Sequence, residues 1–151
     1  MQVTIISDTS CLILLDEIDE LHLLRKLFGQ VIITQIVAIE YGNELPDWVI
    51  VQNPADRKNQ LVLETTLDKG EASSIALALE KENCLLIIDE LRGRKLAKQI
   101  GLTITGTLGV LAQAKQNGHI SALKPLLDKV KLTDFRLSEQ LIQQTLKEVG
   151  E

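Results

Sequence analysis

Short apolar segments alternate along the chain with segments of helical spacing, and this alternation limits the fold more than any other feature. QVTIIS at 2–7 and CLLIID at 84–89 are apolar runs of the kind that form buried strands. Further strands are predicted at 31–34, 48–52 and 102–105. Because strands that alternate with helices form parallel sheets covered on both faces, we expect an α/β fold.

The segments between the strands predict helices, several of them by apolar residues three and four positions apart. Gly29 is placed to end one helix and Thr34 to cap the next. The polar segment 53–60 predicts a flexible loop, whereas LVLETT at 61–66 is compatible with a strand or a helix. The predicted helices lie at 9–15, 19–28, 35–42, 68–83, 91–100, 107–117, 121–131 and about 138–149.

Composition excludes several classes of protein. A length of 151 residues with 45% hydrophobic and 25% charged residues is typical of one soluble globular domain, which we expect to span 1–151. No apolar run approaches the roughly 20 residues of a membrane span, and no secretory signal is visible. Cys11 and Cys84 form no CxxC pair and are expected as reduced, buried thiols. The cytoplasm is therefore the expected location.

Two of the predicted strands end in an aspartate. Asp8 follows the first strand and Asp89 ends the run CLLII, which is apolar enough to lie centrally beside the first strand. Neighbouring parallel strands would bring both carboxylates into one crevice at the carboxyl edge of the sheet. There they would raise each other's pKa unless a cation lay between them, and Mg²⁺ or Mn²⁺ suits such oxygen ligands. The alternative is that each aspartate caps the helix that follows it.

Two glutamates have an unusual sequence context. Glu40 ends the apolar segment QIVAIEYG, where it either has a partner or faces solvent at the last turn of a helix. Glu71 follows Asp68 at the spacing of a capping box, D-x-x-E, which is a sufficient structural role by itself. Nothing in this spacing requires Glu71 to bind a metal.

Five sequence blocks, taken in order, resemble the PIN-domain proteins, and most closely the prokaryotic branch related to VapC toxins. The blocks are IISDTSCLILL, VIITQIVAIEYG, LDKGEASSIALALEKEN, LLIIDELRGRKLAKQIGL and TITGTLGVLAQAKQNGHI. The resemblance covers about residues 2 to 137. It implies a three-layer α/β/α domain with a central parallel sheet of about five strands, acting as a metal-dependent nuclease, usually on RNA.

The same resemblance implies which residues form the site. Four acids match those that bind one or two Mg²⁺ or Mn²⁺ ions and hydrolyse RNA: Asp8, Glu40, Glu71 and Asp89. Many relatives carry a further acid or amide on the loop after the last of these, where this chain has Glu90. Ser10 of the D-T-S motif matches a small hydroxyl residue that donates to Asp8, and Glu90 either acts through a water or faces solvent. For Thr105 and Thr107 we favour helix caps over a place in the crevice.

The net charge of −5 counts against a nucleic-acid ligand when the chain is taken whole. Its distribution does not, because residues 1–90 carry −10 and residues 91–131 carry +7. The basic segment begins close after Asp89, so we expect it to hold RNA phosphates. The alternative is a set of solvated helix faces. The side chains nearest the predicted site are Arg92, Arg94, Lys95 and Lys98.

Partners follow from the resemblance more than from the residues. A toxin role implies an antitoxin protein, and its absence would favour a stand-alone nuclease. A homodimer is a further expectation, with 11–15 and 21–24 as candidate surface. A non-catalytic interaction module would have the same fold without metal binding. A phosphotransfer receiver fits poorly, since Ser7 rather than an acid precedes Asp8.

Overall fold

The computed structural model describes residues 2–151 and contains one five-stranded parallel sheet. The strands lie in the order β3-β2-β1-β4-β5. Their bounds are β1 Thr4–Ser7, β2 Val31–Ile33, β3 Val49–Val51, β4 Cys84–Ile87 and β5 Thr103–Thr105. The five strands predicted from sequence are thus confirmed, each within a few residues.

The central pair of the sheet is β1 and β4, as the apolar character of CLLII predicts. The two strands pair in parallel from Thr4 opposite Cys84 to Ser7 opposite Ile87. Because the strands end together, the residues that follow them emerge at the same edge of the sheet. Asp8 continues this pairing, since its N–H donates to the carbonyl of Ile87 at 2.9 Å.

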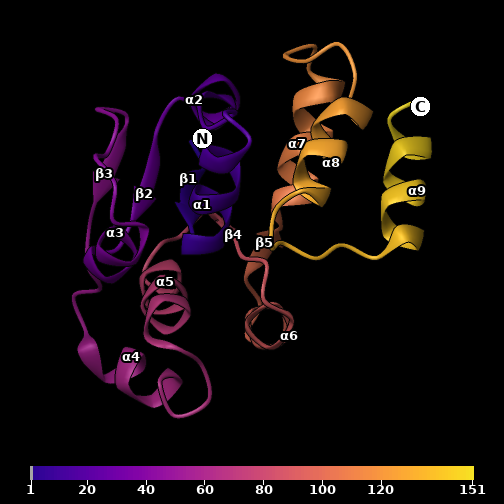
Figure 1. Ribbon diagram of the computed structural model, residues 1–151. Helices are drawn as coiled ribbons and strands as arrows, with labels where there is room; N and C mark the ends of the chain where they lie inside the picture. The colour runs from indigo at the N-terminus through magenta and orange to yellow at the C-terminus, as the bar shows by residue number, and fades with distance from the viewer. Residues whose placement is uncertain (1) are drawn as a thin grey trace.

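Helices cover both faces of the sheet (Figure 1). One layer holds α1, α2, α7, α8 and α9, and the opposite layer holds α4, α5 and α6, with α3 between α1 and α5 at one side. The predicted three-layer α/β/α architecture is confirmed. The bounds are α1 Thr9–Glu17, α2 His22–Phe28, α3 Gln35–Tyr41, α4 Arg57–Leu63, α5 Lys69–Leu79, α6 Leu91–Gln99, α7 Thr107–Gln116, α8 Lys124–Lys131 and α9 Glu139–Glu148.

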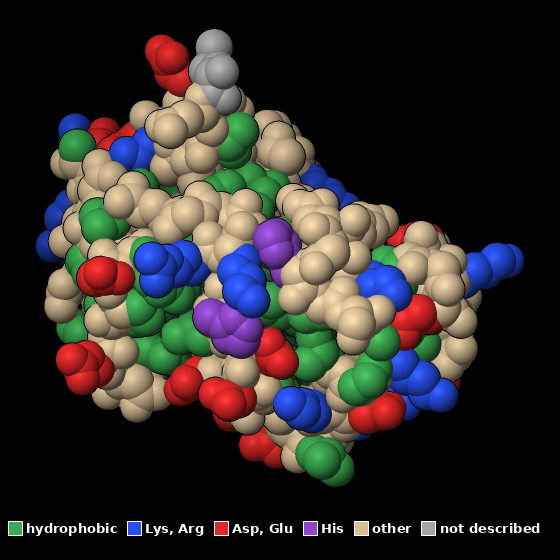
Figure 2. All heavy atoms as spheres, turned by 90° about the horizontal axis from the view of Figure 1, so that it is seen from above, with side chains coloured by type: hydrophobic (Ala, Val, Ile, Leu, Met, Phe, Trp, Pro, Cys, Tyr) green, Lys and Arg blue, Asp and Glu red, His purple; other side chains and the backbone are tan. Residues whose placement is uncertain are grey.

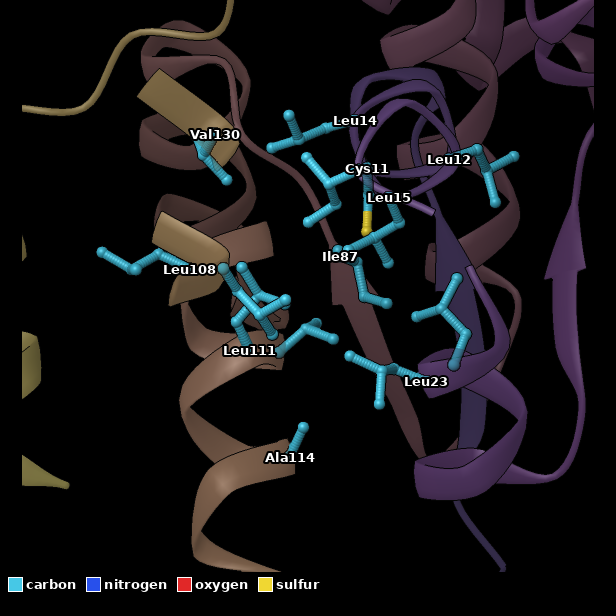
Figure 3. Close-up of a cluster of buried hydrophobic side chains, with 14 of the residues drawn as sticks. Cys11, Leu12, Leu14, Leu15, Leu23, Ile87, Leu108, Leu111, Ala114 and Val130 are labelled. Carbon is cyan, nitrogen blue, oxygen red and sulfur yellow. The ribbon is translucent and has the colours of Figure 1, made fainter. Parts of the chain in front are cut away.

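Two apolar cores hold these layers together, one on each face of the sheet. The larger joins α1, α2, α7 and α8 to β4, and its side chains point toward one another in Figure 3, with Cys11 and Ile87 at its centre. The smaller lies between α5, α6 and the sheet, around Ile75 and Ile88. Both cores reach the carboxyl edge of the sheet, where Ile87 belongs to the larger and Ile88 to the smaller. The residues at that edge are therefore next to packed apolar side chains.

The predicted loop at 53–60 is partly wrong, because α4 begins within it. Asp56 caps α4 by accepting a hydrogen bond from Lys58 N at 2.8 Å. The distant Glu80 holds the preceding turn, accepting from Ala55 N at 2.9 Å and from Asp56 N at 3.0 Å. These contacts order a polar segment that composition alone predicts as flexible. Residues 61–66, which were compatible with a strand or a helix, form the end of α4 and a turn.

Three predicted helices are shorter than their sequence patterns. α2 begins only at His22, because Asp19 adopts a φ of 60° and turns the chain. α5 ends at Leu79 rather than near 83, and Glu80 forms its C-cap. α8 begins at Lys124, where the side chain of Glu151 accepts from the backbone N–H groups of Leu123 and Lys124.

The segments predicted as a dimer surface are largely interior. Leu12, Leu15, Leu23 and Leu24 are each at most 1% exposed and belong to the larger core. Their apolar character is explained by packing against α7 and the sheet. These four leucines are therefore core residues, and a contact with a second copy at these segments would have to use exposed neighbours such as Ile13. The homodimer itself stays a prediction.

The outer surface over the layer of α1, α2, α7, α8 and α9 carries charges of both signs. Figure 2 shows Lys and Arg side chains interspersed with Asp and Glu on this face, with no single-sign area. Within residues 2–151, none of the helices has the length and apolarity that crossing a bilayer requires. Four of the basic residues of 91–131, which are Arg92, Arg94, Lys95 and Lys98, lie instead on α6 in the opposite layer.

Candidate active site

Asp8 lies at the carboxyl edge of the sheet and is 2% exposed. Its Oδ1 accepts a hydrogen bond from Cys11 N at 3.0 Å, so it caps α1 as one of the two sequence-based alternatives predicts. Its Oδ2 accepts from the backbone N–H of Asp89 at 2.9 Å. The carboxylate is therefore fixed both by its own helix and by Asp89, which is 81 residues away in the chain.

Asp89 does not cap the helix that follows it, so that alternative is wrong for this residue. Glu90 caps α6 instead, accepting from Gly93 N at 2.9 Å. Asp89 points across to α7, where its Oδ1 accepts from Thr107 N at 2.8 Å and its Oδ2 from Thr107 Oγ1 at 2.5 Å. Thr107 is the first residue of α7 and not its cap, which is Gly106. Thr107 therefore does not cap α7 as predicted, and instead donates two hydrogen bonds to the carboxylate of Asp89.

The electrostatic environment raises the pKa of both aspartates. Burial raises the pKa of Asp8 to about 7, the charge of Asp89 adds to this, and the N–H donors from Cys11 and Asp89 oppose it. Burial likewise raises the pKa of Asp89, while the hydrogen bonds from Thr107 and the charge of Arg94 oppose the shift. The two adjacent carboxylates, that of Asp8 buried and that of Asp89 half-buried, thus lack sufficient compensating positive charge.

Glu71 occupies the first turn of α5. Its N–H donates to Asp68 Oδ1 at 2.9 Å, which is the forward half of the predicted capping box. Its own Oε2 is buried and has no hydrogen-bond partner among residues 2–151. Burial raises the pKa of Glu71 to about 9, and the carboxyl groups of Asp68 and Glu90 add to the shift. A buried oxygen without a donor is costly, so Glu71 is poised for a ligand that supplies positive charge.

The pKa of Glu90, the α6 cap, shifts in the opposite direction to that of Glu71. The N–H of Gly93 lowers its pKa, and the contact with Glu71 acts in the same direction. Its side chain is exposed. The pKa values of Glu90 and Glu71 thus shift in opposite directions, although the two carboxyl groups are neighbours.

Glu40 ends α3 on an exposed turn, yet its carboxylate faces other elements of the fold. Thr9 Oγ1 donates to Glu40 Oε1 at 2.6 Å. A Cβ added at Gly70 would overlap the same oxygen, so Glu40 also lies against the start of α5. Glu40 therefore lies next to Thr9 and Gly70, which are the chain neighbours of Asp8 and Glu71.

Ser10 is not the donor to Asp8 that the D-T-S motif predicts. It is exposed, and within residues 2–151 the hydrogen bonds to the carboxylate of Asp8 come from Cys11 N and Asp89 N. The hydroxyl of the motif that reaches an acid is that of Thr9. Because Asp8 caps α1, the side chains of the first two helical residues point in different directions, and only Thr9 faces α3.

Thr105, at the end of β5, does not cap α7. Its Oγ1 lies 3.5 Å from the carbonyl of Gly106, and its side chain lines a groove next to Asp89. Of the two favoured threonine caps, neither therefore serves as one, because the carboxylate of Asp89 takes the place at the start of α7.

Three glycines allow the carboxylates to lie this close to neighbouring elements, and sequence reasoning missed all of them. A Cβ at Gly93 would lie 2.9 Å from Glu71 Oε2, and a Cβ at Gly106 would lie 2.9 Å from Asp89 Oδ1. Gly70 makes room for Glu40 in the same way. The signal available in the sequence was a glycine next to a predicted site residue, as Gly70 is to Glu71 and Gly106 is to Thr107.

The four basic residues predicted to hold RNA are divided by the structure. Arg94 Nη1 donates to the carbonyl of Ile88 at 2.8 Å, close to Asp89. Arg92 Nη1 donates to the carbonyl of Thr66 at 3.2 Å and is exposed. Lys95 and Lys98 are exposed on α6. Only Arg94 is thus built into the edge of the sheet next to the acids.

The donor set fits a divalent cation. Among residues 2–151, no Lys, Arg or His forms an ion pair with Asp8, Asp89 or Glu71, and Glu71 Oε2 lacks a donor. No three acidic, histidine or cysteine side chains of that part of the chain converge closely enough to hold an ion as they stand. The fit therefore rests on carboxylate chemistry and uncompensated negative charge, with Asp8, Asp89 and Glu71 as the groups that would hold the ion.

Comparison with known proteins agrees with this description of the fold. The searches among curated proteins and among solved structures found no match. A family model described as a PIN domain matches residues 4–151, which includes all five strands and the four acids. PIN domains are generally nucleases and generally use divalent metals. On this match, with the acids at the carboxyl edge of a parallel sheet, the chain belongs to the PIN-domain family.

Proposed function

We propose that this chain is a divalent-metal-dependent ribonuclease that hydrolyses phosphodiester bonds of RNA. The observation that carries the proposal is the adjacent pair of Asp8, which is buried, and Asp89, which is half-buried; neither carboxylate has an ion-pair partner in the part of the chain that the structure describes. Glu71, with its unpartnered Oε2, supports the same conclusion. Mg²⁺ or Mn²⁺ held by such carboxylates activates a water and neutralises charge on a phosphate.

The residues of the chain would do the positioning. Asp8 is fixed by two N–H donors and Asp89 by Thr107, so neither carboxylate needs to reorganise before the reaction. Arg94 stands next to Asp89 with a guanidinium suited to a phosphate oxygen. Among residues 2–151, no serine, cysteine or histidine beside these groups is hydrogen-bonded to a base that would activate it as a nucleophile, which supports direct attack by water.

Cleavage of a labelled single-stranded RNA tests this proposal. The wild-type protein should produce fragments with Mn²⁺ or Mg²⁺ and none in excess EDTA. Asp8→Asn, purified in the same way and shown to be folded by circular dichroism, should produce none under either condition. Asp47→Asn is the matched control, because Asp47 is exposed and lies before β3, away from the acids.

Two outcomes would contradict the proposal. One is equal cleavage by wild type and Asp8→Asn, and the other is cleavage that persists in excess EDTA. A wild-type protein that neither cleaves RNA nor is stabilised by Mn²⁺ would instead favour the non-catalytic interaction module.

A toxin role is the finer form of the proposal, and the order of the five motif blocks, which resembles the VapC-related branch, supports it. It predicts a neighbouring gene for a small DNA-binding protein that, when co-expressed, blocks the cleavage of RNA. If no such neighbour exists, a stand-alone nuclease is the better description.

A further inference from the structure

The C-terminal helix α9 packs on the domain through one narrow face. Of its ten residues, Ile142, Thr145 and Leu146 are buried, and the two apolar ones belong to the larger core. In Figure 1 the connection 132–138 leaves α8, and α9 then runs back beside α7 and α8. The remaining residues of α9 are half-buried or exposed, so apolar packing holds this helix at few points.

The connection 132–138 adds no polar tie to the rest of the fold. Phe135 N donates to Thr133 Oγ1 at 3.2 Å, and Arg136 Nη1 donates to the carbonyl of Thr133 at 3.1 Å. Within residues 2–151, every hydrogen bond of this connection stays inside 129–142. Two of its apolar side chains pack in part against the larger core. The connection therefore has the character of a hinge.

The far end of α9 is tied to two other helices by one carboxylate. Glu151 accepts from the N–H groups of Leu123 at 2.5 Å and Lys124 at 3.1 Å, at the start of α8. It also lies 3.4 Å from Lys115 Nζ in the last turn of α7, and that Nζ donates to the carbonyl of Ser121 at 2.9 Å. The side chains of Glu151 and Lys115 are only 17% and 23% exposed. We call these contacts of Glu151 the latch.

The start of α8 depends on this latch. Its N-cap residue is Leu123, whose side chain has no hydrogen-bond acceptor, so Glu151 supplies one from 27 and 28 residues away. The N–H of Leu123 and the charge of Lys115 hold the pKa of Glu151 below its ordinary value. The carboxylate is therefore charged at neutral pH.

No other polar contact ties α9 as firmly. Glu139 lies 3.7 Å from Lys131 of α8, but both side chains are about half exposed or more, and such surface pairs contribute little. Among residues 2–151, the remaining side-chain hydrogen bonds of α9 are made within the helix or with its cap Ser138. The latch is thus the principal polar tie of this helix.

The position of α9 also determines the width of the groove beside Asp89. Leu141, Thr145 and Glu148 form the wall of this groove on α9, and α6 with the start of α7 lies opposite. We propose that α9 is a hinged strap, and that release of the Glu151 latch opens the groove while the sheet stays folded. The inference goes beyond the proposed function and does not depend on it, since the latch uses none of the acids at the edge of the sheet.

Amide hydrogen exchange in EDTA, followed by mass spectrometry, tests the latch. Glu151→Ala should speed exchange of 139–149 by about 10-fold or more, as expected from the loss of a charge-assisted hydrogen bond, and leave β1 and β4 unchanged. Glu148→Ala is the matched control on the same helix, because the side chain of Glu148 bonds only to Gln144 within residues 2–151. It should exchange as wild type does.

Lys115→Met is a second variant, and it also serves if Glu151→Ala does not fold. It keeps the length of the side chain and removes the contacts of Nζ with Glu151 and Ser121. We expect a smaller increase in exchange than with Glu151→Ala, because the N–H donors of α8 stay paired. The double variant should add little to Glu151→Ala, since both changes remove one shared contact. Fully additive effects would show that the two side chains do not act as one latch.

The distance between two spin labels tests the opening itself. Leu91→Cys on α6 and Leu141→Cys on α9 place labels at exposed leucines of the groove, 78% and 44% exposed. Cys84→Ser removes the half-buried native thiol, and Cys11 is buried. With the latch intact, double electron–electron resonance should give one narrow distance distribution. Glu151→Ala should add a longer distance.

Two results would overturn the strap proposal. One is that Glu151→Ala matches wild type in exchange and distance, and the other is that exchange rises equally in α9, β1 and β4, as in general destabilisation. Neither measurement needs RNA or metal. If α9 responds to Glu151 but no RNA is cleaved, only the ribonuclease proposal fails, and if RNA is cleaved but α9 does not respond, only the strap proposal fails.

Discussion

Asp8 and Asp89 are joined through the main chain, since Oδ2 of Asp8 accepts a hydrogen bond from the N–H of Asp89 at 2.9 Å. They follow β1 and β4, which pair in register over their whole length. The contact keeps two acidic side chains side by side at a buried edge of the sheet. Because burial favours the neutral forms of both, this edge is electrostatically unfavourable at neutral pH without a cation.

In EDTA, the free energy of unfolding should decrease as the pH rises. The pKa of Asp8 is about 7 in the folded chain, well above its ordinary 3.8, so the folded state holds a proton that the unfolded chain has released. This contribution is complete below the ordinary value and is lost as the pH rises through about 7, at a total of roughly 2–4 kcal/mol. Urea unfolding at about pH 5 and about pH 8 measures it.

The same experiment with Mn²⁺ supplies the control. A cation held by the carboxylates compensates their charge, so saturating Mn²⁺ should restore most of the stability lost at the higher pH. Stability in EDTA that rises with pH over this interval would contradict the description of Asp8.

Thr107 should act on the site through Asp89. Thr107→Val removes the Oγ1–H donor at 2.5 Å from Asp89 Oδ2 and keeps the backbone N–H donor. We expect cleavage to decrease by about 10-fold or more, in line with a lost charge-assisted hydrogen bond of about 1.5–3 kcal/mol. Thr107→Ser keeps the hydroxyl and should retain most activity. Equal activity of the Val and Ser variants would show that the hydroxyl does not position Asp89.

Gly106 should be required for space and not for backbone freedom. Its φ of −115° and ψ of 180° suit any residue. A Cβ there would lie 2.9 Å from Asp89 Oδ1 and 2.8 Å from Arg94 Nη1. Gly106→Ala should therefore displace both groups and decrease cleavage strongly, while it changes stability by less than about 1 kcal/mol. Full activity with unchanged Mn²⁺ affinity would contradict this.

The sequence predicts the frame of the site because the frame depends on local patterns. The apolar run CLLII places β4 in the centre beside β1, and this alone brings Asp8 and Asp89 to one edge. The start of α5 is likewise local, since Asp68 accepts from Glu71 N three residues away. Such features need only the strand order and a cap whose partner lies three residues away, both of which local sequence patterns indicate.

The remaining contacts of the site could not be predicted, because they join residues far apart in the chain. Thr9 meets Glu40 across 31 residues, and Asp89 meets Thr107 across 18. The local alternatives, a donor at Ser10 and caps at Asp89 and Thr107, were reasonable by spacing and are wrong. In each case the hydrogen bond is made with a residue of another element. The packing of α1, α3 and α7 decides which residue becomes that partner.

Arg94 and Arg92 should differ in their effect on the salt dependence of RNA binding. Arg94 stands at the acidic edge, whereas Arg92 reaches the carbonyl of Thr66 on the far side of α6. Arg94→Ala should decrease the slope of log K against log salt by about 1, and Arg92→Ala by less. Affinity titrations over a range of salt concentrations measure the slopes. Two unchanged slopes would remove the basic start of α6 from the RNA surface.

Direct measurement of Mn²⁺ binding shows whether the acids at the edge of the sheet form a metal site. Electron paramagnetic resonance of free Mn²⁺ gives the affinity without any substrate. Wild type and Asp47→Asn should bind Mn²⁺ equally, and Asp8→Asn should bind it at least about 10-fold more weakly, a loss of about 1.4 kcal/mol. Glu71→Gln is the second variant if Asp8→Asn does not fold, with the same expectation. A folded Asp8→Asn or Glu71→Gln protein that binds Mn²⁺ as tightly as wild type would contradict the account.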